Sequence, residues 1–246
     1  MTSPIQKVLS TLSSHRVQSL LIVGQACILY GGAEFSRDAD IAILTSADNL
    51  HRFESALSEL QASPIAVPPF EIDYLRRGHA VHFRCAHPEA NGMRIDVISV
   101  MRGVDSFDDL WLRRTTVEVA PGESYDVIAL QDLVRSKKTQ RDKDWPMIRR
   151  LVESNYAVNS EKPGPEQIEF WLAESRTPSI LRETAAAYPS IARMLAEKRP
   201  MLAAITRMTD EDIEDALEKE EKNERDLDRA YWKPLREELE RIRLAR

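Results

Sequence analysis

The apolar pattern of the chain changes character near residue 155. Before that point, short apolar runs bounded by glycine and proline alternate with segments whose apolar residues recur every three or four positions. Short bounded runs are typical of buried strands, and the longer spacing is typical of helices. After residue 155 only the helical spacing occurs. We therefore expect an α/β fold with a mixed β-sheet flanked by helices over residues 1–154, and an all-helical region over residues 155–246.

The expected elements follow from these runs and from the residues that interrupt them. Ser46 or Asp48 is the expected N-cap of the third helix, residues 155–165 are the expected linker, and Pro234 is one of four prolines that should separate the later helices. The expected strands are 17–23, 39–44, 79–86, 93–100 and 115–119, and the expected helices before the linker are 5–12, 25–30, 49–60, 130–141 and 145–153.

Composition excludes several classes of protein. The 246 residues are 43% apolar and 30% charged, which is too apolar for a disordered chain. No apolar run approaches the roughly 20 residues that span a bilayer, and none near Met1 resembles an export signal. Two cysteines, Cys27 and Cys85, cannot form a disulfide scaffold. We expect a cytoplasmic protein that is not inserted in a membrane.

Charge is unevenly distributed along the chain. The net charge is −6, which disfavours non-specific binding to nucleic acid. Residues 135–150 nevertheless form a basic segment that could hold a phosphate or one nucleic-acid end. Residues 210–228 are strongly acidic. A solvent-exposed helix face explains either segment, and for the acidic one we prefer that interpretation.

Three acids interrupt apolar strands. Asp38 and Asp40 precede Ile41, and Asp96 lies between Ile95 and Val97. Residues two apart in a strand share a face, so two carboxylates should converge there, which is costly without a cation between them. Mg²⁺, which prefers oxygen ligands, meets this need, and three such acids suit a two-metal site. The alternatives are a solvated loop for the first two acids and, for Asp96, an ion pair to a nearby arginine (Arg94 or Arg102).

Three separated elements resemble a known family. They are Gly24-Gln25 after an apolar run, Ser36-Arg37-Asp38-Ala39-Asp40, and Asp96 on a later strand. In this order they resemble the nucleotidyltransferase superfamily that shares the fold of DNA polymerase beta, although Gln25 stands where that family has a second small residue. Residues 133–144 resemble the Lys-x3-Arg-x-Lys-Asp element of a bacterial subgroup, which includes stand-alone enzymes and AbiE-like and Men-like toxins.

The resemblance implies transfer of a nucleoside monophosphate from an NTP to a hydroxyl, with two Mg²⁺ ions as cofactors. Asp38, Asp40 and Asp96 would bind the metals, and Asp96 would also act as or orient the base. The remaining implied residues would contact the nucleotide or its acceptor, with Asp144 orienting a cation: Gly24, Gln25, Ser36, Arg37, Lys137, Lys138, Arg141 and Asp144. The acceptor would be RNA, such as a tRNA 3′ end, or a protein, and an antitoxin could be a partner.

Other candidate sites are weaker. His79, His82, Cys85 and His87 could suggest zinc, but along one strand they are too far apart to meet at one ion. Cys27 lies in an apolar segment and is better explained as a core residue. An exposed helix with a Lys138–Asp142 pair would equally explain the basic segment.

Two other functions remain open. The chain could be a catalytically inactive nucleotide-binding module, or an interaction protein that acts through its helical tail. Nucleotide binding without any product would favour the first, and loss of a partner on deleting residues 209–246 would favour the second.

Overall fold

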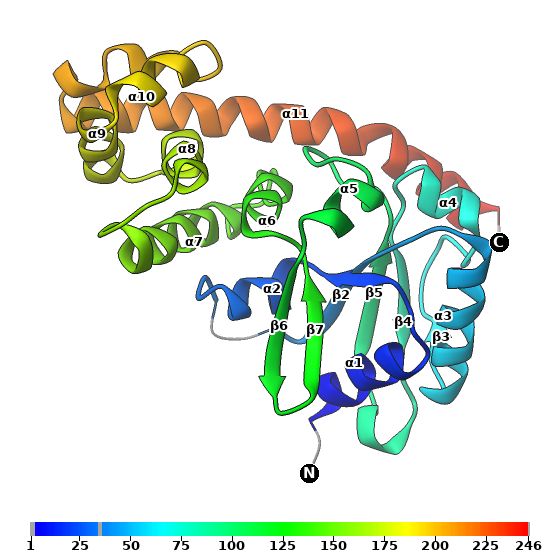
Figure 1. The fold of residues 1–246 in the computed structure, drawn as a ribbon. Helices are drawn as coiled ribbons and strands as arrows, with labels where there is room; N and C mark the ends of the chain where they lie inside the picture. The colour runs from blue at the N-terminus through cyan, green and yellow to red at the C-terminus, as the bar shows by residue number, and fades with distance from the viewer. Residues whose placement is uncertain (1–2, 34–35, 246) are drawn as a thin grey trace. The chain divides into compact units, whose positions relative to one another are not determined.

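A seven-stranded mixed sheet organises the N-terminal part of the chain (Figure 1). The computed structural model describes residues 3–33 and 36–245, so Met1, Thr2, Glu34, Phe35 and Arg246 lie outside the described residues. The strands are β1 (Ser19–Leu21), β2 (Asp38–Ile43), β3 (Ser63–Pro64), β4 (Val81–Arg84), β5 (Arg94–Ile98), β6 (Thr115–Ala120) and β7 (Glu123–Val127). Their order is β3-β4-β5-β2-β1-β7-β6. β2 pairs with β5 and β1 with β7 in parallel, while the other neighbours are antiparallel.

Helices make up most of the remaining chain. The helices before residue 137 are α1 (Pro4–Ser14), α2 (Val23–Leu29), α3 (Ala47–Glu59), α4 (Ile72–Arg76), α5 (Phe107–Leu112) and α6 (Leu130–Ser136). The later ones are α7 (Asp144–Asn159), α8 (Pro165–Glu174), α9 (Pro178–Ala187), α10 (Pro189–Leu195) and α11 (Asp210–Leu244). Short 3₁₀ turns cover Pro88–Ala90, Pro200–Ala203 and Ile205–Arg207. The expected class, a mixed sheet flanked by helices with a helical C-terminal region, is confirmed.

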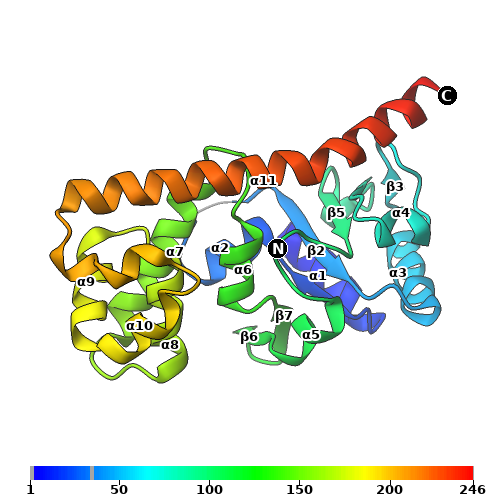
Figure 2. The same cartoon turned by 90° about the horizontal axis from the view of Figure 1, so that it is seen from above.

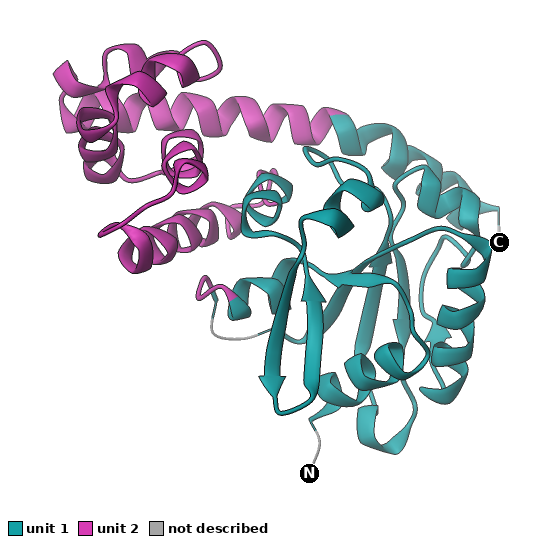
Figure 3. Cartoon of the chain, viewed as in Figure 1, with its two compact units in different colours: residues 1–29, 33–136, 231–246 teal, residues 30–32, 137–230 magenta. Residues whose placement is uncertain are grey.

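Contacts divide the chain into two compact units (Figure 3). The first unit contains residues 1–29, 33–136 and 231–246, and the second contains residues 30–32 and 137–230. The expected boundary between residues 154 and 155 lies within α7. No helix among the described residues has the length and apolar character needed to cross a bilayer.

The core of the first unit lies against one face of the sheet. On β2 this face carries Ala39 and Ile41, and β4 and β5 continue it with Phe83 and Ile95, all of them buried. Phe83 packs edge-to-face against Phe53 of α3, with ring centroids 5.8 Å apart. Burial of these side chains is the main favourable contribution to folding of this unit.

A second core holds the helical unit together. Nine buried apolar residues from α8, α9, α10, the 3₁₀ turns and α11 form one cluster: Ile168, Leu172, Leu181, Ala185, Ala192, Leu202, Ile205, Ile213 and Leu217. Apart from α11, the helices that contribute to it have ten residues or fewer, and helices of this length depend on tertiary packing for their stability. This unit therefore has a hydrophobic core of its own.

Local sequence signals place several helix ends correctly. The Ser46 hydroxyl accepts a hydrogen bond from Asn49 N at 3.3 Å, so Ser46 and not Asp48 is the N-cap of α3. At α1, Ser3 and Gln6 form a reciprocal capping box. These caps satisfy backbone N–H groups that have no partner within the helix.

Other expected boundaries are wrong. β7 was not expected, α6 ends at Ser136 instead of residue 141, and α7 continues through residues 155–159 of the expected linker. Asn155 there accepts a 2.8 Å hydrogen bond from the indole N–H of Trp171, so this segment packs against α8. Pro234 lies inside α11, which is one 35-residue helix instead of two (Figure 2).

A candidate acidic site on one face of the sheet

The pairing of β2 with β5 brings the predicted acids onto one face. Asp40 and Asp96 are direct Cα partners in this parallel pair, and Asp38 is the partner of Arg94. Partners in register point to the same face, and residues two apart in a strand do so as well. Asp38, Asp40 and Asp96 therefore share the face opposite to the apolar core, where each is partly exposed.

β4 extends this face with two more polar side chains. In the antiparallel pair of β4 with β5, His82 is the partner of Asp96 and Arg84 is the partner of Arg94. Across three neighbouring strands one face is thus lined with ionisable groups, whereas the other is apolar and buried. We call the ionisable set, Asp38, Asp40, His82, Arg84, Arg94 and Asp96, the acidic site.

The turn from β1 into α2 lies beside the acidic site. Val23 has a φ of +52°, a conformation that is strained for a β-branched residue. A Cβ atom on Gly24 would lie 2.3 Å from the Ser36 hydroxyl oxygen and 3.6 Å from Asp40 Oδ2. Only glycine therefore fits here without displacing Ser36. The structure brings together three predicted residues that are separated in sequence, namely Gly24, Ser36 and Asp40.

Arg94 and His82 both contact the carboxylate of Asp96. Arg94 Nε donates to Asp96 Oδ1 at 2.6 Å, and His82 Nδ1 lies 2.8 Å from the same oxygen. Burial raises the pKa of Asp96, but the hydrogen bonds and charges of His82 and Arg94 outweigh burial and hold that pKa below its usual value. Asp96 is therefore an anion near neutral pH. The ion pair with Arg94, weighed as an alternative from the sequence, is present in the structure.

Arg94 also lies in the field of the other two acids. Its hydrogen bond to Asp96 raises the pKa of Arg94 against a smaller effect of burial, and the charges of Asp96, Asp38 and Asp40 raise it further. The positive charge of Arg94 thus interacts with all three carboxylates. Sequence reasoning did not include Arg94 or His82 among the site residues, although both follow the two-residue alternation of their strands.

The remaining predicted residues of the first unit flank the acidic site in sequence. Gln25 is half-buried in the first turn of α2, and Arg37 is exposed immediately before β2. The Ser36 hydroxyl donates to the carbonyl oxygen of Asp38 at 3.2 Å, which ties the segment before β2 to the strand.

All of the basic segment after residue 136 belongs to the second unit. Lys137 Nζ lies 3.0 Å from Asp144 Oδ1, and both side chains are almost fully buried. Arg141 Nε and the Thr139 hydroxyl donate to Asp144 Oδ2 at 2.8 and 2.6 Å. Burial raises the pKa of Asp144, but the charges of Lys137 and Arg141 and the hydrogen bond from Thr139 reverse this effect and lower it. Asp144, the first residue of α7, therefore orders the loop of residues 137–143.

The pair proposed for an exposed helix does not form. Residues 137–143 are not helical, so Lys138 and Asp142 are not one helical turn apart. Instead, Lys138 pairs with Glu174 at 2.7 Å and Asp142 pairs with Arg225. Lys138 and Arg141 remain partly accessible to solvent, whereas Lys137 does not.

The three histidines considered for a zinc site each contact a different partner. His79 pairs with Glu238, His82 pairs with Asp96, and His87 accepts a hydrogen bond from Glu89 N. Cys85 is buried, and burial raises the pKa of its thiol to about 11. Over residues 3–33 and 36–245, no three or more His, Cys, Asp or Glu side chains are grouped in a way that could hold a metal ion.

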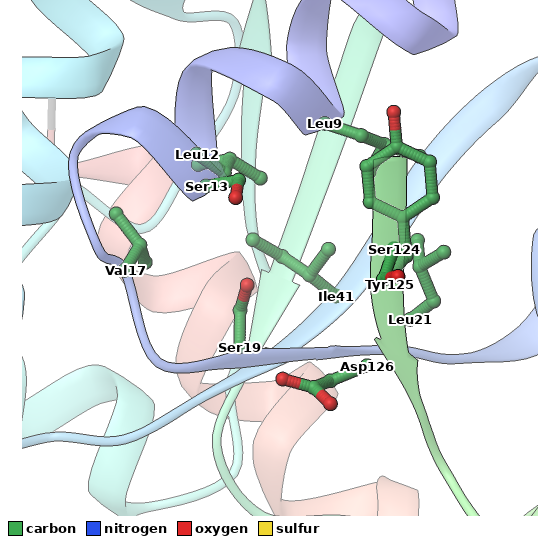
Figure 4. A pocket seen from close by; sticks show the side chains of 10 residues that line it. All are labelled: Leu9, Leu12, Ser13, Val17, Ser19, Leu21, Ile41, Ser124, Tyr125 and Asp126. Carbon is green, nitrogen blue, oxygen red and sulfur yellow. The ribbon is translucent and has the colours of Figure 1, made fainter. Parts of the chain in front are cut away.

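A small cavity lies on the other face of the sheet, beneath α1 (Figure 4). Its volume is about 70 Å³, which is space for a few water molecules at most. The lining residues are Leu9, Leu12, Ser13, Val17, Ser19, Leu21, Ile41, Ser124, Tyr125 and Asp126. Because Ile41 belongs to the apolar face, this cavity is separate from the acidic site.

No protein-family model and no curated protein sequence matches this chain.

Proposed function

We propose that the chain is a Mg²⁺-dependent nucleotidyltransferase that transfers a nucleoside monophosphate from an NTP to a hydroxyl acceptor. The observation that carries the proposal is the direct pairing of Asp40 with Asp96, with Asp38 on the same face. Three carboxylates on one partly exposed face supply the hard oxygen ligands that Mg²⁺ prefers, and their mutual repulsion favours a bound cation. The chemistry of these donors therefore suits Mg²⁺, and a bound ion would have to draw the three carboxylates together, because among the described residues they do not form a metal-binding group.

The tight turn at Gly24 is the second support. The absence of a side chain at this position leaves the backbone of the turn close to Ser36 and Asp40. Glycine at such a turn allows close approach of a phosphate, and strain such as that at Val23 is common at functional sites.

The reaction assigns a role to each of these residues. Asp38, Asp40 and Asp96 would hold the cations, and Ser36 and Arg37 would donate hydrogen bonds to the phosphates. When bound, Mg²⁺ would activate the acceptor hydroxyl and neutralise charge on the leaving group. A bond forms between the acceptor oxygen and the α-phosphorus as the bond to pyrophosphate breaks, and the hydroxyl proton passes to a carboxylate, for which Asp96 is our candidate.

The second unit offers further cations. Lys138 and Arg141 reach solvent and are the proposed contacts for a phosphate-bearing substrate. Lys137, buried against Asp144, orders the loop that carries them. The acceptor is proposed to be an RNA end, such as a tRNA 3′ hydroxyl, or a protein hydroxyl, and a toxin role with a neutralising antitoxin would follow from the family resemblance.

The test is transfer from each α-³²P-labelled NTP, with Mg²⁺, to total cellular RNA and separately to total protein. We expect label in one acceptor class, and loss on the order of 10²-fold or more in Asp38→Asn and Asp40→Asn. Asp48→Asn is the control, because it removes an exposed carboxylate from α3, which packs on the apolar face. Nucleotide binding without product in either class would support the inactive-module alternative instead.

A further inference from the structure

Arg94 occupies a central position in the acidic site. It is the Cα partner of Asp38 and lies two residues before Asp96 on the same strand and face. Its Nε bonds Asp96 at 2.6 Å, and its second guanidinium nitrogen lies 3.0 Å from His82 Nδ1. Its side chain is 37% exposed, whereas that of Asp96 is 18% exposed. The guanidinium group of Arg94 therefore contacts both the partly buried carboxylate of Asp96 and the solvent.

The chain supplies its own counter-charge in this arrangement. Three carboxylates on one face repel one another, and a fixed cation among them reduces that repulsion. An arginine cannot lose its proton to relieve the contact. A divalent cation at Asp96 would need the same carboxylate that Arg94 holds, and it would meet the positive charge of Arg94 at short range.

We propose that Arg94 is a built-in counter-ion of the acidic site, and that a divalent cation must displace it from Asp96. This inference rests on the proposed function, because it takes Asp38, Asp40 and Asp96 as the cation ligands. The carboxylate of Asp96 contacts Arg94 and His82. Among the described residues, no three His, Cys, Asp or Glu side chains are grouped closely enough to hold a metal ion. By competing for Asp96, Arg94 lowers the affinity of the acidic site for a divalent cation.

Arg84 supplies a matched comparison. It is the Cα partner of Arg94 on β4, lies on the same face and is exposed. In the part of the chain that the structure describes, no ion pair of Arg84 with a carboxylate is found. Neutralising Arg84 therefore changes the net charge of the face by the same amount without releasing Asp96.

The experiment measures Mn²⁺ binding to the full chain by electron paramagnetic resonance of the free ion. We expect Arg94→Gln to bind Mn²⁺ about tenfold more tightly than the native chain, and Arg84→Gln to stay within about twofold. The melting temperature without metal should fall in Arg94→Gln and recover on adding Mn²⁺. Arg94→Lys, which keeps the charge, should bind Mn²⁺ more weakly than Arg94→Gln and is the variant to use if the latter fails to fold.

The outcomes separate this inference from the proposed function. Equal or weaker Mn²⁺ binding by Arg94→Gln, or an equal gain in Arg84→Gln, overturns the role of Arg94 even where transfer activity is present. A gain confined to Arg94→Gln and abolished by adding Asp40→Asn supports that role even where no transfer is detected. Absence of Mn²⁺ binding in every variant overturns both.

Discussion

His79 Nε2 lies 2.8 Å from Glu238 Oε2 and thereby joins the turn after α4 to the last part of α11. The His79 side chain is fully buried, and Arg77 donates to the other oxygen of Glu238 at 2.8 Å. This contact ties the C-terminal segment to the first unit, to which both residues belong.

Glu238→Ala should destabilise the first unit. It leaves a buried imidazole without its partner, which costs about 1–3 kcal/mol. The control is Glu237→Ala, because Glu237 is exposed on the neighbouring position and its loss should change the free energy of unfolding by less than about 0.5 kcal/mol. Urea unfolding of both variants measures the difference. Equal stabilities would show that the contact contributes nothing.

Glu59 should make the stability of the first unit sensitive to acid. Hydrogen bonds from Lys7 and then His15 lower its pKa from 4.5 to about 2, so the folded form binds a proton less readily than the unfolded form. The ionised Glu59 side chain therefore stabilises the folded form above about pH 4.5, and this stabilisation is lost as the pH falls towards 2. Because the side chain is 42% exposed, we expect less than about 1 kcal/mol. Glu59→Gln should remove this part of the pH dependence, as measured by urea unfolding between pH 7 and 3.

Gly24 and Ser36 should be energetically coupled. Gly24→Ala places a Cβ 2.3 Å from Ser36 Oγ and 2.8 Å from Ser36 Cβ, and overpacking of this kind costs about 1–3 kcal/mol. Ser36→Gly removes both atoms, so the double variant should recover part of the loss. A coupling energy above about 0.5 kcal/mol in the free energy of unfolding supports the contact. Additive effects would contradict it.

Lys137→Met should strongly destabilise the second unit. It removes the buried cation that pairs with Asp144 and leaves only the half-exposed Arg141, and breaking a buried ion pair costs about 3–5 kcal/mol. Because the pKa of Asp144 is lowered in the folded state, the stability that this carboxylate provides should also decline as the pH falls.

Two variants control the Lys137 prediction. Lys143→Met removes an exposed lysine from the same loop and should be nearly neutral. Lys137→Met with Asp144→Asn should be more stable than Lys137→Met alone, because no uncompensated charge remains buried. Thermal unfolding monitored by circular dichroism distinguishes these cases, and a stable Lys137→Met variant at pH 7 would contradict the importance of the pair.

Local sequence was sufficient for much of the fold. The alternation of Asp38 and Asp40 with Ala39 and Ile41 predicts which side chains share a face, because the geometry of a strand depends only on neighbouring residues. The same holds for the Ser46 cap, whose hydroxyl bonds a backbone N–H three residues away.

The ends of helices that depend on contacts with residues distant in sequence could not be predicted from the local sequence pattern. Proline removes one helical hydrogen bond, yet α11 continues through Pro234, where Leu235 is buried and Glu238 bonds His79. The helix predicted over residues 130–141 ends at Ser136, and residues 137–143 form a loop beside the buried Asp144. In both cases packing outweighs a local preference of a few kcal/mol.

The sequence by itself therefore determined that Asp38, Asp40 and Asp96 are acids within apolar strands and that the first two share a face. Only the tertiary structure decided that Asp96 lies opposite Asp40, and that Arg94 and His82 hold it. The physical reason is that register between strands distant in sequence depends on the packing of the whole sheet, and a shift of one residue would move Asp96 to the buried face.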